Sequence, residues 1–179
     1  MVSRQRLQKS FDGCTSAQQR LALWCDDPEL LQLHAPKVSA WTIGLHVEHL
    51  SKTAALILDF LERFLEVGGE KGWGKRPNVV GWMVLLSRFI PRGSADVPDF
   101  LCPIGVDMPS LLEELKSTDR RLEGLGSELE TLAAMSGTQP HPLLGHFTVI
   151  QWFDFLVIHD HHHYKIVRDI ARVRGVSVQ

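Results

Sequence analysis

Residues 148–174 read TVIQWFDFLVIHDHHHYKIVRDIARVR, and this stretch specifies the fold more strongly than any other. Its apolar residues recur at steps of three and four, the period of a helix that buries one face. Thr148 and Gln151 predict a capping box, so we expect a single helix that continues to about Arg174. Four of the five residues from 159 to 163 are histidines. A long amphipathic helix with histidines at its centre is therefore the starting point for both fold and function.

His159 and His163 are one turn apart on this helix and share a face. The same face carries Trp152, Phe155, Leu156, Ile166, Val167 and Ile170. Both imidazoles are therefore predicted to point toward the core. Two histidines four residues apart can hold one metal ion, whereas burying them without partners would be costly. The alternative is a pair of core histidines that bond to facing polar groups.

The remaining periodic segments predict an all-α protein, a four-helix bundle that forms one domain over residues 1–179. Three more long helices are expected at residues 3–25, from Ser39 or Thr42 to Val67, and from Pro109 to Ala134. We expect the four helices to run antiparallel, with the glycine- and proline-rich connection 69–106 crossing one end of the bundle. A short helix at 78–89 interrupts this connection. Its apolar residues should be buried over the bundle or against a second subunit; they are Val79, Val80, Met83, Val84 and Leu86.

Composition excludes several kinds of partner. The chain has 179 residues, 44% of them hydrophobic, and a formal charge of −2. Nucleic acids and anionic membranes require a basic excess, so we expect neither as a partner. No apolar stretch is long enough to span a bilayer. Three scattered cysteines without a CxxC pair indicate reduced thiols in a cytoplasmic protein, and Cys102 is expected to be buried.

A third metal ligand would have to come from another helix, and the second helix offers His46 and His49. Counting helical angles slightly favours His46, and it places Glu48 on the solvated side. The loop histidines His141 and His146 are too far from His159 to be ligands and are expected to order their loop. His161 points away from the apolar face and is expected to be solvated.

Three stretches resemble the DinB/YfiT-like superfamily of four-helix metalloproteins, and together they extend the resemblance over essentially the whole chain. They are Trp41-Thr42 with Glu48-His49-Leu50, His141-Pro142-x-x-Gly145 with Gln151-Trp152, and His159-x-x-His162-His163. The resemblance implies that His49, rather than His46, joins His159 and His163 as metal ligands. The ion would be a divalent metal such as zinc, nickel or iron.

The resemblance also implies a function. Three imidazoles leave a coordination position open, so the metal could activate a low-molecular-weight thiol or a water for transfer or hydrolysis of a small-molecule substrate. The nearest candidates for a general base are His46, His162 and Tyr164. The alternative is a non-catalytic stress-response or binding bundle with a structural or vestigial metal. The segment around Trp73 and Trp82 would then be a partner surface. A homodimer is expected in either case.

Overall fold

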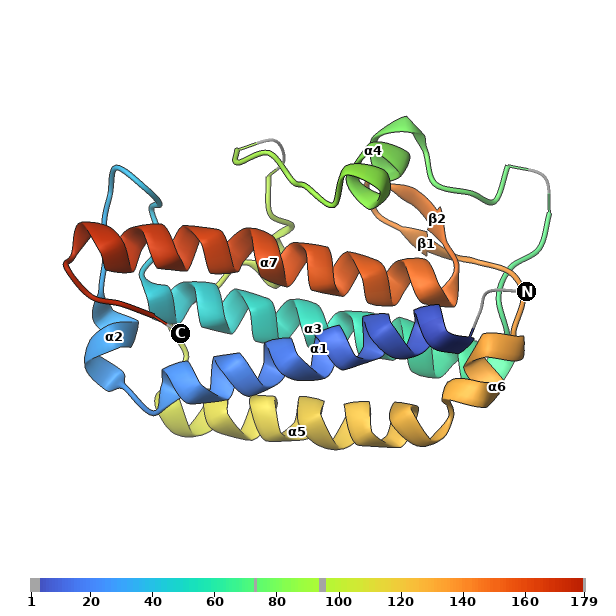
Figure 1. Cartoon of the computed structure of the whole chain (residues 1–179), viewed down its shortest axis with the longest axis horizontal. Helices are drawn as coiled ribbons and strands as arrows, with labels where there is room; N and C mark the ends of the chain where they lie inside the picture. The colour runs from blue at the N-terminus through green and yellow to red at the C-terminus, as the bar shows by residue number, and fades with distance from the viewer. Residues whose placement is uncertain (1–3, 73, 94–95, 179) are drawn as a thin grey trace.

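A computed structural model describes residues 4–72, 74–93 and 96–178 of the chain. Its long helices form a bundle, which confirms the predicted all-α fold (Figure 1). They are α1 (Arg4–Cys25), α3 (Ile43–Val67), α5 (Met108–Ser127) and α7 (Val149–Val173). The shorter elements are α2 (Pro28–Gln32), α4 (Val79–Ser87), the 3-10 helix η1 (Asp99–Leu101), α6 (Leu129–Ala134) and the antiparallel strands β1 (Gln139–His141) and β2 (Gly145–Phe147).

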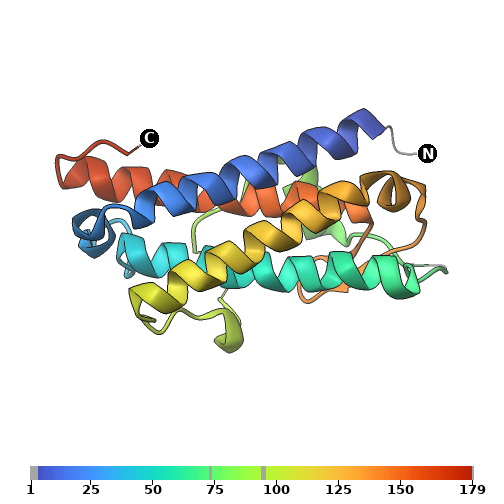
Figure 2. The ribbon, with the colours of Figure 1, turned by 90° about the horizontal axis from the view of Figure 1, so that it is seen from below.

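The long helices do not all run antiparallel to their neighbours, which corrects one prediction. Helices α1 and α7 run side by side in the same direction, and so do α3 and α5 (Figures 1 and 2). Helix α3 ends at one end of the bundle, and α5 begins at the other. The connection between them must therefore return the full length of the bundle, so it runs along the flank instead of crossing one end. Antiparallel packing joins α3 to α7 and α1 to α5.

Local capping signals account for where the helices begin. The side chain of Thr42 accepts the N–H of Leu45, so α3 begins after Thr42 rather than after Ser39. Thr148 and Gln151 form the expected capping box at the start of α7. Gly68, with φ of 72°, ends α3 in a conformation that favours glycine. The third predicted helix is divided in two, because the backbone of Glu128 leaves helical geometry between α5 and α6.

The core lies between the apolar faces of the long helices. Its largest fully buried side chains include Trp152, Phe153, Phe64 and Phe147. The small hairpin β1–β2 lies beside the first turns of α7 (Figure 1), where Phe147 packs against Trp152. None of the described helices is long and apolar enough to cross a lipid bilayer.

Helix α4 is where the burial prediction is wrong for the single chain. Val84 is buried, but Val79 and Leu86 are each 77% exposed and Met83 is 65% exposed. The helix packs beside α7 and the hairpin through a narrow face, where Gly81 lies directly against the carbonyl of Leu144. A face that narrow cannot cover the remaining apolar side chains. Their burial against a second subunit stays a prediction.

Candidate metal centre

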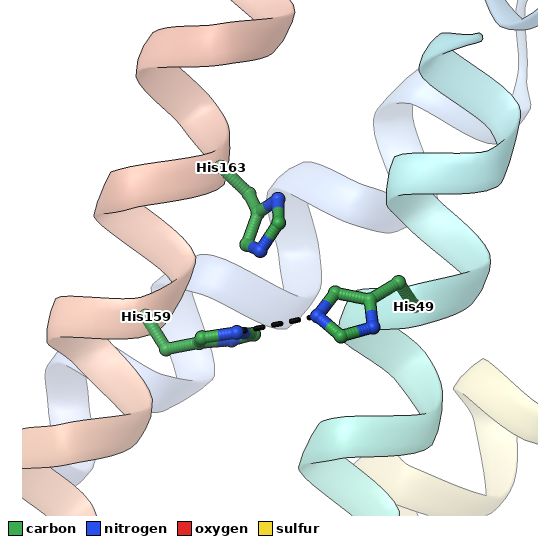
Figure 3. Close-up of side chains that lie close together, drawn as sticks. All are labelled: His49, His159 and His163. Carbon is green, nitrogen blue, oxygen red and sulfur yellow. Dashed lines mark hydrogen bonds between the residues drawn. The ribbon is translucent and has the colours of Figure 1, made fainter. Parts of the chain in front are cut away.

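Helices α3 and α7 bring together His49, His159 and His163 (Figure 3). One ring nitrogen from each residue lies within 4.8 Å of the others. The shortest separation is 3.3 Å, between Nε2 of His49 and Nε2 of His159. The two helices are antiparallel neighbours, so the turn of α7 that carries His159 and His163 faces the start of α3. His49 and His163 are buried, and His159 is partly buried.

The imidazole of His49 is oriented by a backbone carbonyl. Its Nδ1–H donates to the carbonyl of Leu101, in η1, over 2.9 Å. Because a neutral imidazole carries one proton, Nε2 is left as an unprotonated acceptor that faces His159. A backbone partner of this kind is what fixes the ring and the tautomer of a metal-binding histidine.

A second chain of contacts orients His163. Its Nδ1 lies 2.9 Å from Nδ1 of His46, and Nε2 of His46 lies 3.0 Å from the hydroxyl of Ser39. That hydroxyl in turn accepts the backbone N–H of Trp41. If His163 Nδ1 donates to His46, then His163 Nε2 is unprotonated and points between His49 and His159, as the ring does in Figure 3. His46 therefore contacts His163 through Nδ1, the ring nitrogen of His163 that does not face the other two histidines.

Burial keeps these imidazoles neutral. It lowers the pKa of His159 and His163 well below the ordinary value of 6.5, and the neighbouring histidines lower both further. Burial also lowers the pKa of His49 and brings that of His46 to about 3. A neutral imidazole is the form that binds a metal ion, so the electrostatics of the site favour ligation.

The donor set fits a divalent ion. Three nitrogens on a tetrahedral ion at about 2.1 Å lie about 3.4 Å from one another. The 3.3 Å separation of His49 and His159 already matches this, and the third nitrogen would need only a small side-chain shift. Within the described residues no fourth histidine, cysteine or carboxylate joins the group. Among the described residues, the buried Nδ1 of His159 has no hydrogen-bond partner, whereas Nδ1 of His49 and of His163 each have one. The orientation of the His159 ring is therefore the least constrained of the three.

Trp41 forms a wall of the cluster. Its ring centroid is 5.2 Å from those of His46 and His49, and it stacks nearly parallel to His163 at 6.3 Å. Trp41 directly precedes the Thr42 cap of α3, and its ring covers one side of the histidines. This contact gives the tryptophan of the sequence motif a physical role.

Glu48 is not solvated, which corrects another prediction. Its side chain is buried, forms an ion pair with Lys52 at 2.8 Å, and accepts the backbone N–H groups of Ile104, Gly105 and Val106. Burial alone would raise the pKa of this carboxyl, but these bonds hold it below its ordinary value. No local signal could have predicted this, because the covering loop lies more than fifty residues further along the chain.

The structure places the other candidates outside the histidine group. His162 Nδ1–H donates to the carbonyl of Ile90. Tyr164 stacks on Trp24 beneath the guanidinium of Arg20, on the side of α7 that faces α1. The three candidates for a general base thus lie at different distances from the histidine group: His46 contacts it, His162 flanks it, and Tyr164 lies away from it.

The remaining predicted residues show one error. His141 accepts the N–H groups of Leu143 and Leu144, in the loop-ordering role that was expected, and His161 is exposed. Cys102 is exposed rather than buried, because it follows η1 on the outer side of the connection. Trp73 lies outside the described residues.

Comparison with known proteins agrees with this architecture. The sequence model of the DinB superfamily matches residues 3–167, nearly the whole chain. The protein therefore belongs to the DinB superfamily, as its sequence motifs and helical bundle indicated. No curated protein and no solved structure matches the chain.

Proposed function

We propose that this protein is a metal-dependent enzyme in which His49, His159 and His163 hold a divalent ion, zinc, nickel or iron. When bound, such an ion lowers the pKa of a coordinated thiol or water and polarises a carbonyl, which suits transfer or hydrolysis. The substrate would be a small molecule, with a low-molecular-weight thiol as its partner in the transfer reaction. A cytoplasmic location would supply such thiols.

One observation carries this proposal: three neutral imidazoles converge. Two of them also contact a supporting group through Nδ1, the ring nitrogen that does not face the cluster. His49 is anchored by Leu101, and His163 contacts His46. A structural zinc site normally closes its coordination with a fourth protein ligand. The described residues supply three, which is the number that leaves room for a reacting molecule.

Metal content tests the ligand set. Purified protein should bind one equivalent of zinc, measured by elemental analysis after dialysis. His159→Ala should weaken zinc binding by more than about 100-fold, since it removes a ligand and not only its support. His161→Ala is the matched control, because it removes an exposed histidine of the same helix and should leave the metal content unchanged. Stoichiometric zinc in a His159→Ala, His163→Ala double variant would overturn the proposal.

An open position can be tested separately with cobalt(II) in place of zinc. Added 2-mercaptoethanol should produce a thiolate-to-cobalt charge-transfer band if a thiol can enter the coordination sphere. A change in the cobalt spectrum with azide but not with the thiol would favour hydrolysis over thiol transfer. A spectrum that responds to neither ligand would contradict an enzyme site of this kind.

A binding bundle with a structural metal is the second candidate, and the exposed apolar face of α4 favours it. Val79, Met83 and Leu86 are mostly exposed in the single chain, and Trp82 is 42% exposed. Apolar side chains gathered in this way mark interaction surfaces. A cobalt site closed to both added ligands would select this candidate.

A further inference from the structure

A basic groove lies beside the histidine cluster, between residues 88–92 and the outer flank of α7. It has a cavity volume of about 350 Å³. Arg88 and Arg92 line one side, and Lys165 lines the other together with His161 and His162. None of the described residues that line it is acidic. A concave site of this size accommodates a small organic molecule.

Nearby carboxylates do not neutralise the groove. Asp169 pairs with Arg92 at 2.7 Å but also with Arg172 at 3.0 Å. Asp154 lies 3.4 Å from Arg88 and is also paired with Arg6 at 3.0 Å. Each carboxylate is therefore divided between a groove arginine and a second arginine, so part of the positive charge of Arg88 and Arg92 remains in excess.

Lys165 adds to this excess. Its ammonium lies 6.0 Å from the centre of the Phe89 ring, and it has no carboxylate partner among the described residues. Phe89, Ile90 and Ile158 give the groove an apolar lining between the charges. Cations around an apolar lining suit an anion that is attached to a hydrocarbon body.

The groove adjoins the proposed metal site at His162. The His162 ring lines the groove, and its centroid is 4.9 Å from that of His163. A molecule in the groove would therefore lie next to the cluster.

We propose that this groove binds the anionic group, a carboxylate or a phosphate, of an organic molecule whose reacting end reaches His49, His159 and His163. Anion binding by the groove is independent of the metal. The statement that the bound molecule reaches the cluster rests on the proposed function. The substrate class that follows is an anionic small molecule, and for thiol transfer an anionic thiol.

The first test uses ¹⁵N-labelled, metal-free protein titrated with sodium succinate and, separately, with inorganic phosphate at constant ionic strength. Amide signals of residues 88–90, of Arg92 and of residues 158–165 should shift and saturate. The two titrations show whether carboxylate or phosphate is preferred. Arg92→Gln and Lys165→Gln should each weaken binding by about five- to tenfold, since each removes one charge from a partly solvated site.

Two variants control for this result. Arg120→Gln makes the same charge change at an exposed ion pair on α5 and should leave the affinity unaltered. Arg92→Lys keeps the charge and should retain most of the binding. Shifts that never saturate, or that weaken equally in Arg120→Gln, would overturn the groove as an anion site, whatever the metal content of the protein.

The link to the cluster is tested with two thiols on the cobalt-loaded protein. Mercaptosuccinate, which carries carboxylates, should produce the charge-transfer band at about tenfold lower concentration than 2-mercaptoethanol. Arg92→Gln should remove this advantage while the cobalt content is unchanged. Equal affinity for both thiols would refute the link and leave the metal site standing.

Discussion

His46 and His49 lie three residues apart on α3, yet they meet the α7 histidines differently. His49 presents a ring nitrogen to the cluster, whereas His46 contacts the far side of His163 and the hydroxyl of Ser39. In the proposed metal site, His49 would therefore be a ligand, and His46 would support the ligand His163. Support of this kind tunes both the orientation and the basicity of a ligand.

Replacing His46 should therefore weaken metal binding without removing it. For His46→Ala we expect zinc affinity to fall by about 10- to 100-fold, the usual cost of removing a group that orients a ligand. Competition with a chelating dye would measure this. The effect should be smaller than that of His159→Ala and should be absent in His161→Ala. Wild-type affinity in His46→Ala would show that His163 needs no support.

For single residues, the sequence predicts side-chain direction and capping well where one helix alone determines them. The stripe of α7 placed His159 and His163 inward, and the capping residues were correct. Counting helical angles slightly favoured His46, whereas His49 is the residue that joins His159 and His163. Both residues are buried and both contact α7, so angles along one helix do not decide between them. Glu48 and Cys102 were assigned wrongly because their exposure depends on where the distant connection packs.

At the scale of elements, two helical glycines have opposite consequences. A Cβ at Gly81 would lie 2.3 Å from the Leu144 carbonyl, whereas a Cβ at Gly124 on α5 meets nothing within 4 Å. Gly81 thus allows α4 to approach the turn of the hairpin closely. Gly124 has no packing neighbour that would exclude a side chain.

Alanine substitutions should reveal this difference. Gly124→Ala should raise the free energy of unfolding by about 0.5–1 kcal/mol through helix propensity. Gly81→Ala should lower it by about 1–3 kcal/mol, the cost of overpacking, because α4 must move away from the hairpin turn at Leu144. Urea denaturation followed by circular dichroism would measure both. A stabilised Gly81→Ala variant would mean that α4 packs less closely than described.

Elements were predictable where their signals are local. Thr42, Gly68 and Thr148 act within one turn of the chain, so the limits of α3 and α7 followed from sequence. The direction of α5 relative to α3 did not, because hydrophobic periodicity carries no information about direction. The exposure of α4 was also missed, since its apolar composition says nothing of how narrow its contact with α7 is.

For the whole molecule, buried neutral histidines predict loss of stability in acid. The pKa of His141 is lowered by burial to about 4 and that of His46 to about 3, whereas both are near 6.5 when unfolded. Between these values the unfolded chain binds more protons than the folded one. The free energy of unfolding should thus fall as pH decreases from 6.5 toward 4, by about 1.4 kcal/mol per pH unit for each such histidine.

His141→Asn isolates one of these contributions, because an amide oxygen can still accept the Leu143 and Leu144 N–H groups but does not titrate. Urea titrations with a chelator present should show a shallower pH dependence for the variant below pH 6.5 and a parallel one above it. Identical slopes for both proteins would show that His141 is protonated equally in the two states.

The homodimer expected from the sequence gives a prediction about oligomeric state. If α4 packs against a second subunit, combined substitution of Val79, Met83 and Leu86 by serine should convert a dimer to a monomer, since each of these side chains is mostly exposed in the single chain. Size-exclusion chromatography with light scattering would show the change in mass.

A matched variant controls for general loss of apolar surface. Leu23, Val67 and Val173 are 64%, 68% and 61% exposed and lie on other helices. Their replacement by serine should leave the mass unaltered. A wild-type protein that is monomeric at all concentrations would rule out this assembly.

Glu48 and His49, adjacent in sequence, both hold the segment 101–106, one through three amide hydrogens and the other through a carbonyl. These amides exchange with deuterium only when the segment lifts away from α3. When the segment moves away, the ring of His49 also loses its hydrogen bond to Leu101. A metal ion bound to His49 would therefore disfavour this open state. Deuterium uptake at Ile104, Gly105 and Val106 should consequently slow when zinc is added. Hydrogen exchange of this segment would thus report metal binding at the site even though no substrate is known.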